Sequence, residues 1–207
     1  MQYICQAARC EQEPDPSGHV TVLPGHPFIG KLGYSGCNQL RSITFPPELK
    51  EIRTSAFFNC RNLEKINGMD SATSNLQKIE SGAFYGIGAK SIHIPDSLKY
   101  LGDSSFANSQ LESVTWGPNI KLDHIGNSTF ANTKLRSIHI PDSVKVIGKA
   151  AFVNIPSLQS VTWGANSSCK HIKSNAFEND GLINVTLPRS MEQLSVYSFA
   201  ANRFVIS

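Results

Sequence analysis

The chain is poor in charged residues. They make up 17% of its 207 residues, and 19 lysines and arginines against 16 acidic residues leave a net charge of only +3. The basic residues are also scattered along the chain, whereas phosphate binding needs a concentrated basic face. The composition therefore predicts no nucleic-acid partner.

Long apolar runs are absent as well. No stretch approaches the roughly 18 consecutive apolar residues of a membrane-spanning helix, so we expect no membrane span. The first ten residues lack the basic start and the unbroken apolar stretch of a secretory signal peptide. The sequence by itself therefore predicts a cytoplasmic protein.

Cysteine occurs five times, and the odd number favours a reducing compartment or free thiols. Cys37 and Cys60 each stand three residues after an aromatic residue of the repeat described below, so their side chains should stack on one another. A bridge between them is geometrically conceivable. Free cysteine is among the most buried residue types, however, so we predict two core thiols.

Motifs for catalysis or metal binding are scarce. Residues 25–32 resemble a phosphate-binding loop, but Leu32 stands where a serine or threonine would hold magnesium. Cys169 and His171 are a single weak pair of zinc-ligand types with no second pair. We therefore predict no enzyme activity, no metal and no cofactor.

A repeat dominates what the sequence does contain. Eight times, an isoleucine or leucine is followed five residues later by an aromatic ring with a small residue just before it. The rings are Tyr34, Phe57, Phe84, Phe106, Phe130, Phe152, Phe177 and Phe199. Intervals of 22 to 27 residues between them are typical of a solenoid, in which each unit buries its apolar face against the next.

Each repeat also carries a short alternating segment, such as Ile138-His-Ile140 or Val114-Thr-Trp116. A β-branched residue between polar neighbours predicts a short strand with one buried face. Segments reading Ser-Ile-His-Ile-Pro alternate with segments reading Ser-Val-Thr-Trp-Gly, so the units should alternate in structure. Trp116 and Trp163 fall at inward positions, and we expect them to pack in the core.

The pattern resembles a known family. Residues 40–57 and 135–152, the latter reading Leu-Arg-Ser-Ile-His-Ile-Pro-Asp-Ser-Val-Lys-Val-Ile-Gly-Lys-Ala-Ala-Phe, are similar to BspA-type leucine-rich repeats of bacterial and protist surface proteins. The resemblance covers about residues 19–204. It implies a leucine-rich repeat solenoid, a right-handed β-rich arc of about eight repeats with parallel strands on its concave face. It also implies protein recognition or adhesion at a cell surface.

The residues that flank the β-branched centre of each strand should point away from the core and form two polar columns. We take these columns as the candidate binding face: Ser42, Thr44, Lys65, Asn67, Ser91, His93, Ser113, Thr115, Ser137, His139, Ser160, Thr162, Asn184 and Thr186. Serine and threonine also suit any exposed pleated surface, so a purely structural interpretation competes with this one.

Three hypotheses for function follow. The leading one is a non-enzymatic recognition or adhesion module that binds a protein partner through the concave Ser/Thr face and the edge loops. An intracellular scaffold or adaptor is the alternative, favoured by the missing signal peptide and the odd cysteine count. A glycan-binding solenoid is less favoured, because Lys65, His93 and His139 interrupt the regular columns of hydroxyl groups.

The two ends of the chain differ from the repeats. Residues 1–18 are expected to form an N-terminal cap or a disordered leader, and Tyr3, Ile4, Ala7 and Ala8 have the spacing of a short helix. Residues 19–207 form the array, whose last repeat is incomplete. Because an array without a cap exposes apolar surface and an open strand edge, we expect the C-terminal end to continue in a longer array or to self-associate.

Overall fold

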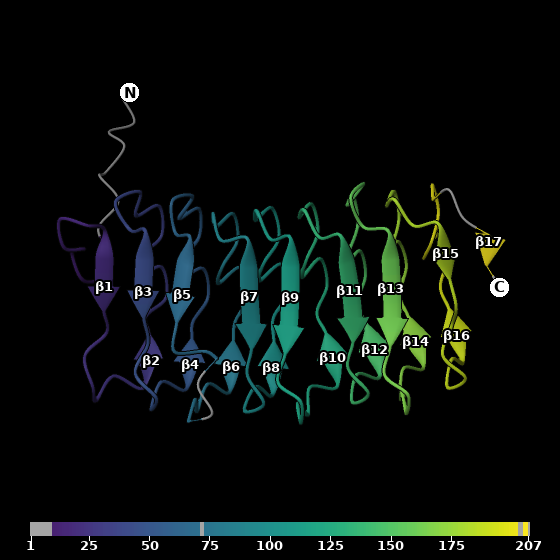
Figure 1. The fold of residues 1–207 in the computed structure, drawn as a ribbon, viewed down its shortest axis with the longest axis horizontal. Helices are drawn as coiled ribbons and strands as arrows, with labels where there is room; N and C mark the ends of the chain where they lie inside the picture. The colour runs from purple at the N-terminus through teal and green to yellow at the C-terminus, as the bar shows by residue number, and fades with distance from the viewer. Residues whose placement is uncertain (1–9, 71–72, 203–204, 207) are drawn as a thin grey trace.

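The computed structural model describes residues 10–70, 73–202 and 205–206, so the helix predicted within residues 3–8 lies outside the described residues. The described residues form a parallel β-solenoid of about eight turns that contains no helix (Figure 1). The predicted solenoid is thereby confirmed. Among these residues there is also no helix with the length and apolarity that crossing a membrane requires.

Each coil carries two strands of different length. The strands of the first row are β1 (His19–Thr21), β3 (Ser42–Thr44), β5 (Lys65–Asn67), β7 (Ser91–Ile94), β9 (Ser113–Trp116), β11 (Ser137–Ile140), β13 (Ser160–Trp163), β15 (Asn184–Val185) and β17 (Val205–Ile206). The two-residue strands of the second row are β2 (Phe28–Ile29), β4 (Glu51–Ile52), β6 (Lys78–Ile79), β8 (Tyr100–Leu101), β10 (His124–Ile125), β12 (Val146–Ile147), β14 (His171–Ile172) and β16 (Gln193–Leu194).

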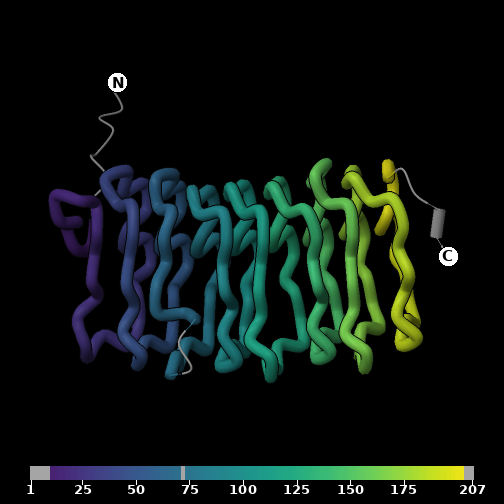
Figure 2. Tube along the Cα trace, in the orientation of Figure 1, coloured from purple at the N-terminus to yellow at the C-terminus, as the bar shows by residue number. Residues whose placement is uncertain are grey.

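Where neighbouring strands of a row pair, they are parallel and in register. Ile138 pairs with Val161 in the first row, and Ile147 pairs with Ile172 in the second. Figure 2 shows the coils following one another along the long axis, from the N-terminal to the C-terminal end. The sequence predicts the first row of strands. For the second row it indicates only an apolar segment on which each coil returns.

The core is a continuous stack of aromatic rings, one from each coil. The eight rings lie face to face with centroids between 4.9 and 5.6 Å apart and interplanar angles of 14° or less. All are buried, from Tyr34 at one end to Phe199 at the other. Each stacked pair contributes about 0.5–1.5 kcal/mol beyond the burial of its apolar area, so the ladder ties every coil to the next.

The turn that presents each ring has an unusual backbone. A residue with positive φ stands two positions before the ring and another two positions after it in all eight coils. The positions after the ring are Gly36, Asn59, Gly86, Asn108, Asn132, Asn154, Asn179 and Ala201. Glycine and asparagine tolerate this left-handed conformation best, which explains why they recur there.

The turns of successive coils are joined through their main chains. The N–H of Phe57 donates to the carbonyl of Ala83 at 2.7 Å, and the N–H of Phe130 donates to the carbonyl of Ala151 at 2.8 Å. Backbone groups that would otherwise be buried without partners are satisfied in this way. The turns therefore form a hydrogen-bonded ladder of their own beside the rings.

The strand ladders are interrupted at four junctions within the described residues. In the first row β5 does not pair with β7, β9 with β11, or β13 with β15, and in the second row β8 does not pair with β10. Gly117 and Gly164 donate their N–H groups to the preceding coil across paired junctions. The aligned residues at the three first-row gaps are Pro95, Pro141 and Pro188, which have no N–H to donate.

Residues 10–18 close the N-terminal edge of the array. Cys10 forms a disulfide with Cys37, the N–H of Glu11 donates to the carbonyl of Gly33 at 2.6 Å, and the Glu11 carboxylate accepts from the N–H of Gly30 at 3.2 Å. Gly33 has no side chain, which leaves room for this carboxylate. The first coil is therefore covered by a segment outside the repeat.

The prediction of two core thiols is half wrong. Cys60 is a buried free thiol, as predicted, but Cys37 is bridged to Cys10. The sequence places Cys37 correctly in the stacked column and gives no indication that a cysteine from outside the repeat reaches it. Burial raises the pKa of Cys60 to about 12, so this thiol is protonated and a poor nucleophile.

Candidate functional site

The exposed side of the first-row strands, which we call the strand face, carries the fourteen candidate residues. None of them is buried. The register aligns Ser42 with Lys65, Ser91 with Ser113 and Ser137 with Ser160 in one column, and His93 with Thr115 in the other. The structure therefore brings the predicted residues into two columns, as expected, although nothing in it tests whether they bind a partner.

Two residues missing from the prediction extend the columns at the N-terminal end. His19 pairs with Ser42, and Thr21 pairs with Thr44. The signal for them was present in the sequence as a weaker copy of the strand pattern, in which Val20 takes the inward position. This copy is a weak signal because the residues before it do not follow the repeat.

Hydrogen bonds between side chains run along the columns. Nδ1 of His19 lies 2.7 Å from Oγ of Ser42, and Nδ1 of His93 lies 3.0 Å from Oγ1 of Thr115. His139 makes the same contact with Thr162 at 3.1 Å. Each imidazole is therefore held by a hydroxyl group of the following coil, which fixes its orientation on the face.

The strand face carries little charge. Within its columns only Lys65 is formally charged at pH 7 with histidine taken as neutral. The charged side chains lie at the edge before the strands, where Glu112 faces both Lys90 at 3.6 Å and Arg136 at 3.3 Å. The face is therefore a neutral strip of hydroxyl, amide and imidazole groups beside a line of ion pairs.

The two tryptophans bridge gaps in the first row. Nε1 of Trp116 donates to the carbonyl of His139, and Nε1 of Trp163 donates to the carbonyl of Thr186, both at 2.8 Å. The Trp116 ring also meets Phe130 edge to face, with centroids 6.3 Å apart. The predicted core packing is confirmed in part, because both side chains pack against the core yet stay half-buried.

A hollow of about 390 Å³ lies where Trp116 reaches the edge of the strand face. Its apolar lining includes Trp116, Pro118 and Pro141, and its polar lining includes His139 and Asp142. It opens beside the gap between β9 and β11. This hollow is the place on the strand face where an apolar group of a partner could be enclosed.

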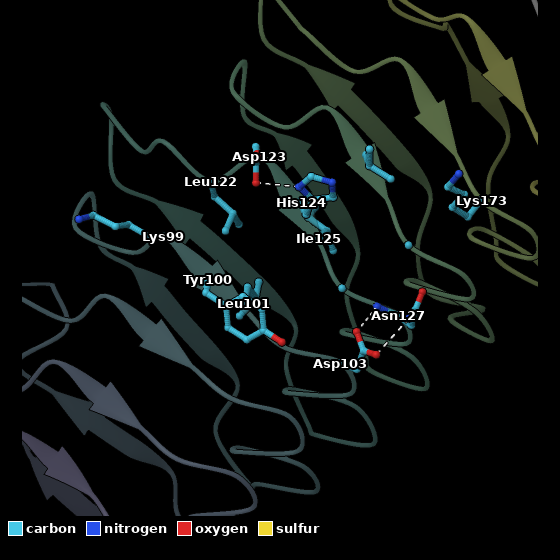
Figure 3. Close-up of a pocket in the computed structure, with 13 residues that line it drawn as sticks. Lys99, Tyr100, Leu101, Asp103, Leu122, Asp123, His124, Ile125, Asn127 and Lys173 are labelled. Atoms are coloured by element: carbon cyan, nitrogen blue, oxygen red, sulfur yellow. Dashed lines mark hydrogen bonds and ion pairs between the residues drawn. The ribbon is translucent and has the colours of Figure 1, made fainter.

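A second hollow, of about 360 Å³, lies at the gap between β8 and β10 in the other row of strands (Figure 3). Figure 3 shows Tyr100 and Leu101 on one side and His124 and Ile125 on the other. The carboxylate of Asp103 accepts hydrogen bonds from the N–H and the Nδ2 of Asn127 at one end. We call this hollow the cross-gap groove.

Neither hollow holds a cluster of metal-ligating side chains among the described residues. Within the described part of the chain, no three His, Cys, Asp or Glu side chains converge as a metal site would need. The Asp123 carboxylate is hydrogen-bonded to Nδ1 of His124 at 2.7 Å, and this contact lowers the pKa of Asp123. What the arrangement offers is hydrogen bonding and apolar contact on two long surfaces.

Coils stacked by an aromatic ladder, with parallel strands that display a polar face, define a leucine-rich repeat protein. The model of the BspA type leucine rich repeat region matches the chain in six copies, over residues 23–122, 70–162 and 123–205. The chain belongs to this family. The membership suggests a module for protein interaction or adhesion, the broad class that the sequence predicts.

Solved structures share the fold. A leucine-rich repeat protein from Bacteroides ovatus is 24% identical with a TM-score of 0.62, and the alignment covers 86% of this chain and 53% of that one. The pneumococcal vaccine antigen PcpA is 21% identical with a TM-score of 0.58, over 91% and 43% of the two chains. A leucine rich cell surface protein from Faecalibacterium prausnitzii is 21% identical with a TM-score of 0.51, over 86% and 65%.

At these identities the likeness shows the fold alone. The chain spans between 43% and 65% of the lengths of these three proteins. No curated protein matches the chain.

Proposed function

We propose that the chain is a non-enzymatic recognition module that binds a protein partner through the strand face and the loops at its edge. The observation that supports this most directly is the row of exposed, register-aligned polar side chains on a rigid ladder of strands. Binding residues held on strands lose little conformational freedom when a partner docks. The hollow beside Trp116 adds an enclosed apolar contact of the kind that dominates interface energies.

The disulfide supports an extracellular setting for this module. Cysteine pairs such as Cys10 and Cys37 persist in oxidising environments and are reduced in the cytosol. An intracellular scaffold would lose the bond that fastens the N-terminal cap. The Faecalibacterium protein, which shares the fold, is described as a cell surface protein, and this agrees with an extracellular setting.

The test is a pair of double variants compared in affinity capture. Ser113→Arg with Ser137→Arg places two long cations in the middle of the strand face, where both serines are exposed. Ser81→Arg with Gln110→Arg adds the same charge at exposed positions outside it. A partner captured by the natural chain from an extracellular-matrix preparation should bind the first variant at least tenfold more weakly and the second unchanged.

Thermal unfolding of both variants separates folding from binding, and both midpoints should stay near that of the natural chain. If the strand-face variant binds every captured partner as tightly as the control does, the strand face is not the binding surface. Partners captured from a cell lysate alone, with none from the matrix, would favour the scaffold function instead.

Self-association is a secondary proposal for the C-terminal coil. Leu194, Val196 and Tyr197 are 40%, 69% and 69% exposed there, close to the last strand of the second row. Apolar residues on an open strand edge favour pairing with another chain. Sedimentation velocity should show a concentration-dependent dimer that Val196→Lys weakens, and a monomer at all concentrations would contradict it.

A further inference from the structure

The cross-gap groove arises at the one junction where the second row of strands is unpaired within the described residues. Elsewhere in this row the backbone closes the ladder, as when Gly102 donates to Ile79 at 2.8 Å and Gly148 donates to Ile125 at 2.9 Å. The equivalent N–H of Gly126 makes no such bond to Leu101. The backbone ladder between the two coils is therefore interrupted on this side, while β7 and β9 stay paired on the other.

An aromatic ring forms one wall of this groove. Tyr100 is 48% exposed. Lys78, which pairs with Tyr100 in the preceding coil, lies with its Nζ atom 5.6 Å from the ring centroid. Because this contact comes from the preceding coil, the groove side of the ring is available to a ligand.

Hydrogen-bonding groups stand at both ends of the groove. At one end Asn127 holds the Asp103 carboxylate through contacts of 2.8 and 3.0 Å, and Asn127 in turn accepts from the N–H of Lys149. At the other end Asp123 and His124 form their own pair. A carboxylate can accept further hydrogen bonds beyond those it already makes. Both ends therefore offer oriented acceptors to a ligand with several hydroxyl groups.

The charges around the groove cancel. Lys99 and Lys173 line it together with Asp103 and Asp123. The two carboxylates disfavour a polyanion, and the two ammonium groups disfavour a polycation. Between them the floor is apolar, formed by Leu101, Ile125 and Val146 among others. The ligand that fits is uncharged, with one apolar face and polar groups at its rim.

We propose that the cross-gap groove binds an uncharged sugar ring of a glycan. A pyranose has a face of C–H groups that can lie against Tyr100, and hydroxyl groups at its rim that can donate to Asp103 and Asp123. The volume of about 360 Å³ falls at the lower end of the range of about 300–1,000 Å³ for small-ligand sites. This site is separate from the strand face and does not depend on the function proposed for that face.

The experiment uses the full chain and a printed array of neutral and acidic oligosaccharides, followed by titration of the best neutral binder. We expect binding to neutral sugars. Tyr100→Ala should weaken the binding at least tenfold. Phe28→Ala is the matched control, because Phe28 is an exposed second-row ring that carries Arg53 over it, as Tyr100 carries Lys78, and does not line the groove. It should bind as the natural chain does.

Amide NMR spectra locate the site independently of the variants. Addition of the neutral sugar should shift the signals of His124, Gly126 and Asn127 more than those of the strand face. The proposal is overturned if no neutral sugar binds, if Tyr100→Ala binds as tightly as the Phe28→Ala control, or if the shifts cluster on the strand face. Binding of apolar peptides in this groove in place of sugars would equally reject it.

Discussion

The carboxyl group of Asp180 accepts a hydrogen bond from the N–H of Ile155 at 2.8 Å, while its second oxygen is buried without a partner. Asp180 occupies the third position after its ring. The side chains at this position in two other coils, Ser109 and Thr133, donate to the carbonyl of the ring residue three positions earlier. Only a protonated Asp180 has a hydrogen to donate in the same way.

The buried Asp180 carboxyl group predicts that the stability of the folded chain depends on pH. Burial raises the pKa of Asp180 to about 8 from its ordinary value of 3.8. The folded chain therefore holds a proton that the unfolded chain releases. Its contribution is fully present below about pH 3.8 and is lost as the pH rises through about 8. Asp180→Asn keeps an acceptor for Ile155, supplies an N–H donor and carries no charge.

Asp180→Asn should therefore raise the free energy of unfolding by about 1–3 kcal/mol at pH 8, with a smaller gain at pH 5, where the natural carboxyl group is protonated. Urea unfolding at pH 8 and at pH 5 measures the change in the free energy of unfolding at each pH. Asp70→Asn, at an exposed position, is the control and should change neither value by more than about 0.5 kcal/mol. An equal gain at both pH values would show that Asp180 is not protonated in the folded chain.

Two adjacent alanines give a second prediction. Ala150 has φ of 54°, a left-handed conformation that costs an L-residue roughly 1–2 kcal/mol, whereas its neighbour Ala151 has no positive φ and is fully buried. Ala150→Gly should leave stability unchanged or raise it by up to about 1 kcal/mol. Ala151→Gly should lower it by about 1 kcal/mol or more, because it loses a buried methyl group and adds backbone freedom.

Chemical denaturation of the two glycine variants provides the measurement. The substitutions are chemically identical and sit side by side, so their difference reports the backbone conformation of Ala150 together with the burial of the Ala151 methyl group. If both variants lose stability equally, the turn does not impose the left-handed conformation on Ala150.

The N-terminal cap gives the third prediction. The Cys10–Cys37 disulfide closes a loop with a sequence separation of 27 residues, and its removal should cost about 2–4 kcal/mol. Reduction of the natural chain should lower its thermal midpoint, and Cys10→Ser should match the reduced chain. Cys169→Ala should remain as sensitive to reductant as the natural chain, because that buried thiol is unpaired.

Peptide mapping without reduction should find residues 10 and 37 linked. A reductant that leaves the thermal midpoint of the natural chain unchanged would show that the cap contributes nothing to stability. A linkage between Cys37 and Cys60 would contradict the pairing itself.

The repeat is visible in the sequence because every stacked coil must pack against its neighbours in the same way. Equivalent positions must supply a ring, a β-branched residue and polar flanks, so the array, the first row of strands and the outward columns can all be predicted. The asparagines after the rings, such as Asn108 and Asn132, were an equally regular signal for the left-handed turn positions.

Other features depend on relations that no repeat encodes. Cys10 lies before the array, and its pairing with Cys37 depends on the path of a segment that has no counterpart elsewhere. The cross-gap groove arises where β8 and β10 do not pair, in two coils that both follow the repeat. A pattern that specifies each coil says little about which backbone groups of neighbouring coils pair, so this site becomes visible only in three dimensions.

The gaps in the two rows of strands do not coincide. Each of the three junctions open in the first row is bridged in the second row. There β6 pairs with β8, β10 pairs with β12, and β14 pairs with β16. The junction open in the second row is held by β7 and β9. No plane of cleavage therefore passes between two described coils without cutting a ladder of hydrogen bonds. Such an array resists shear along its whole length.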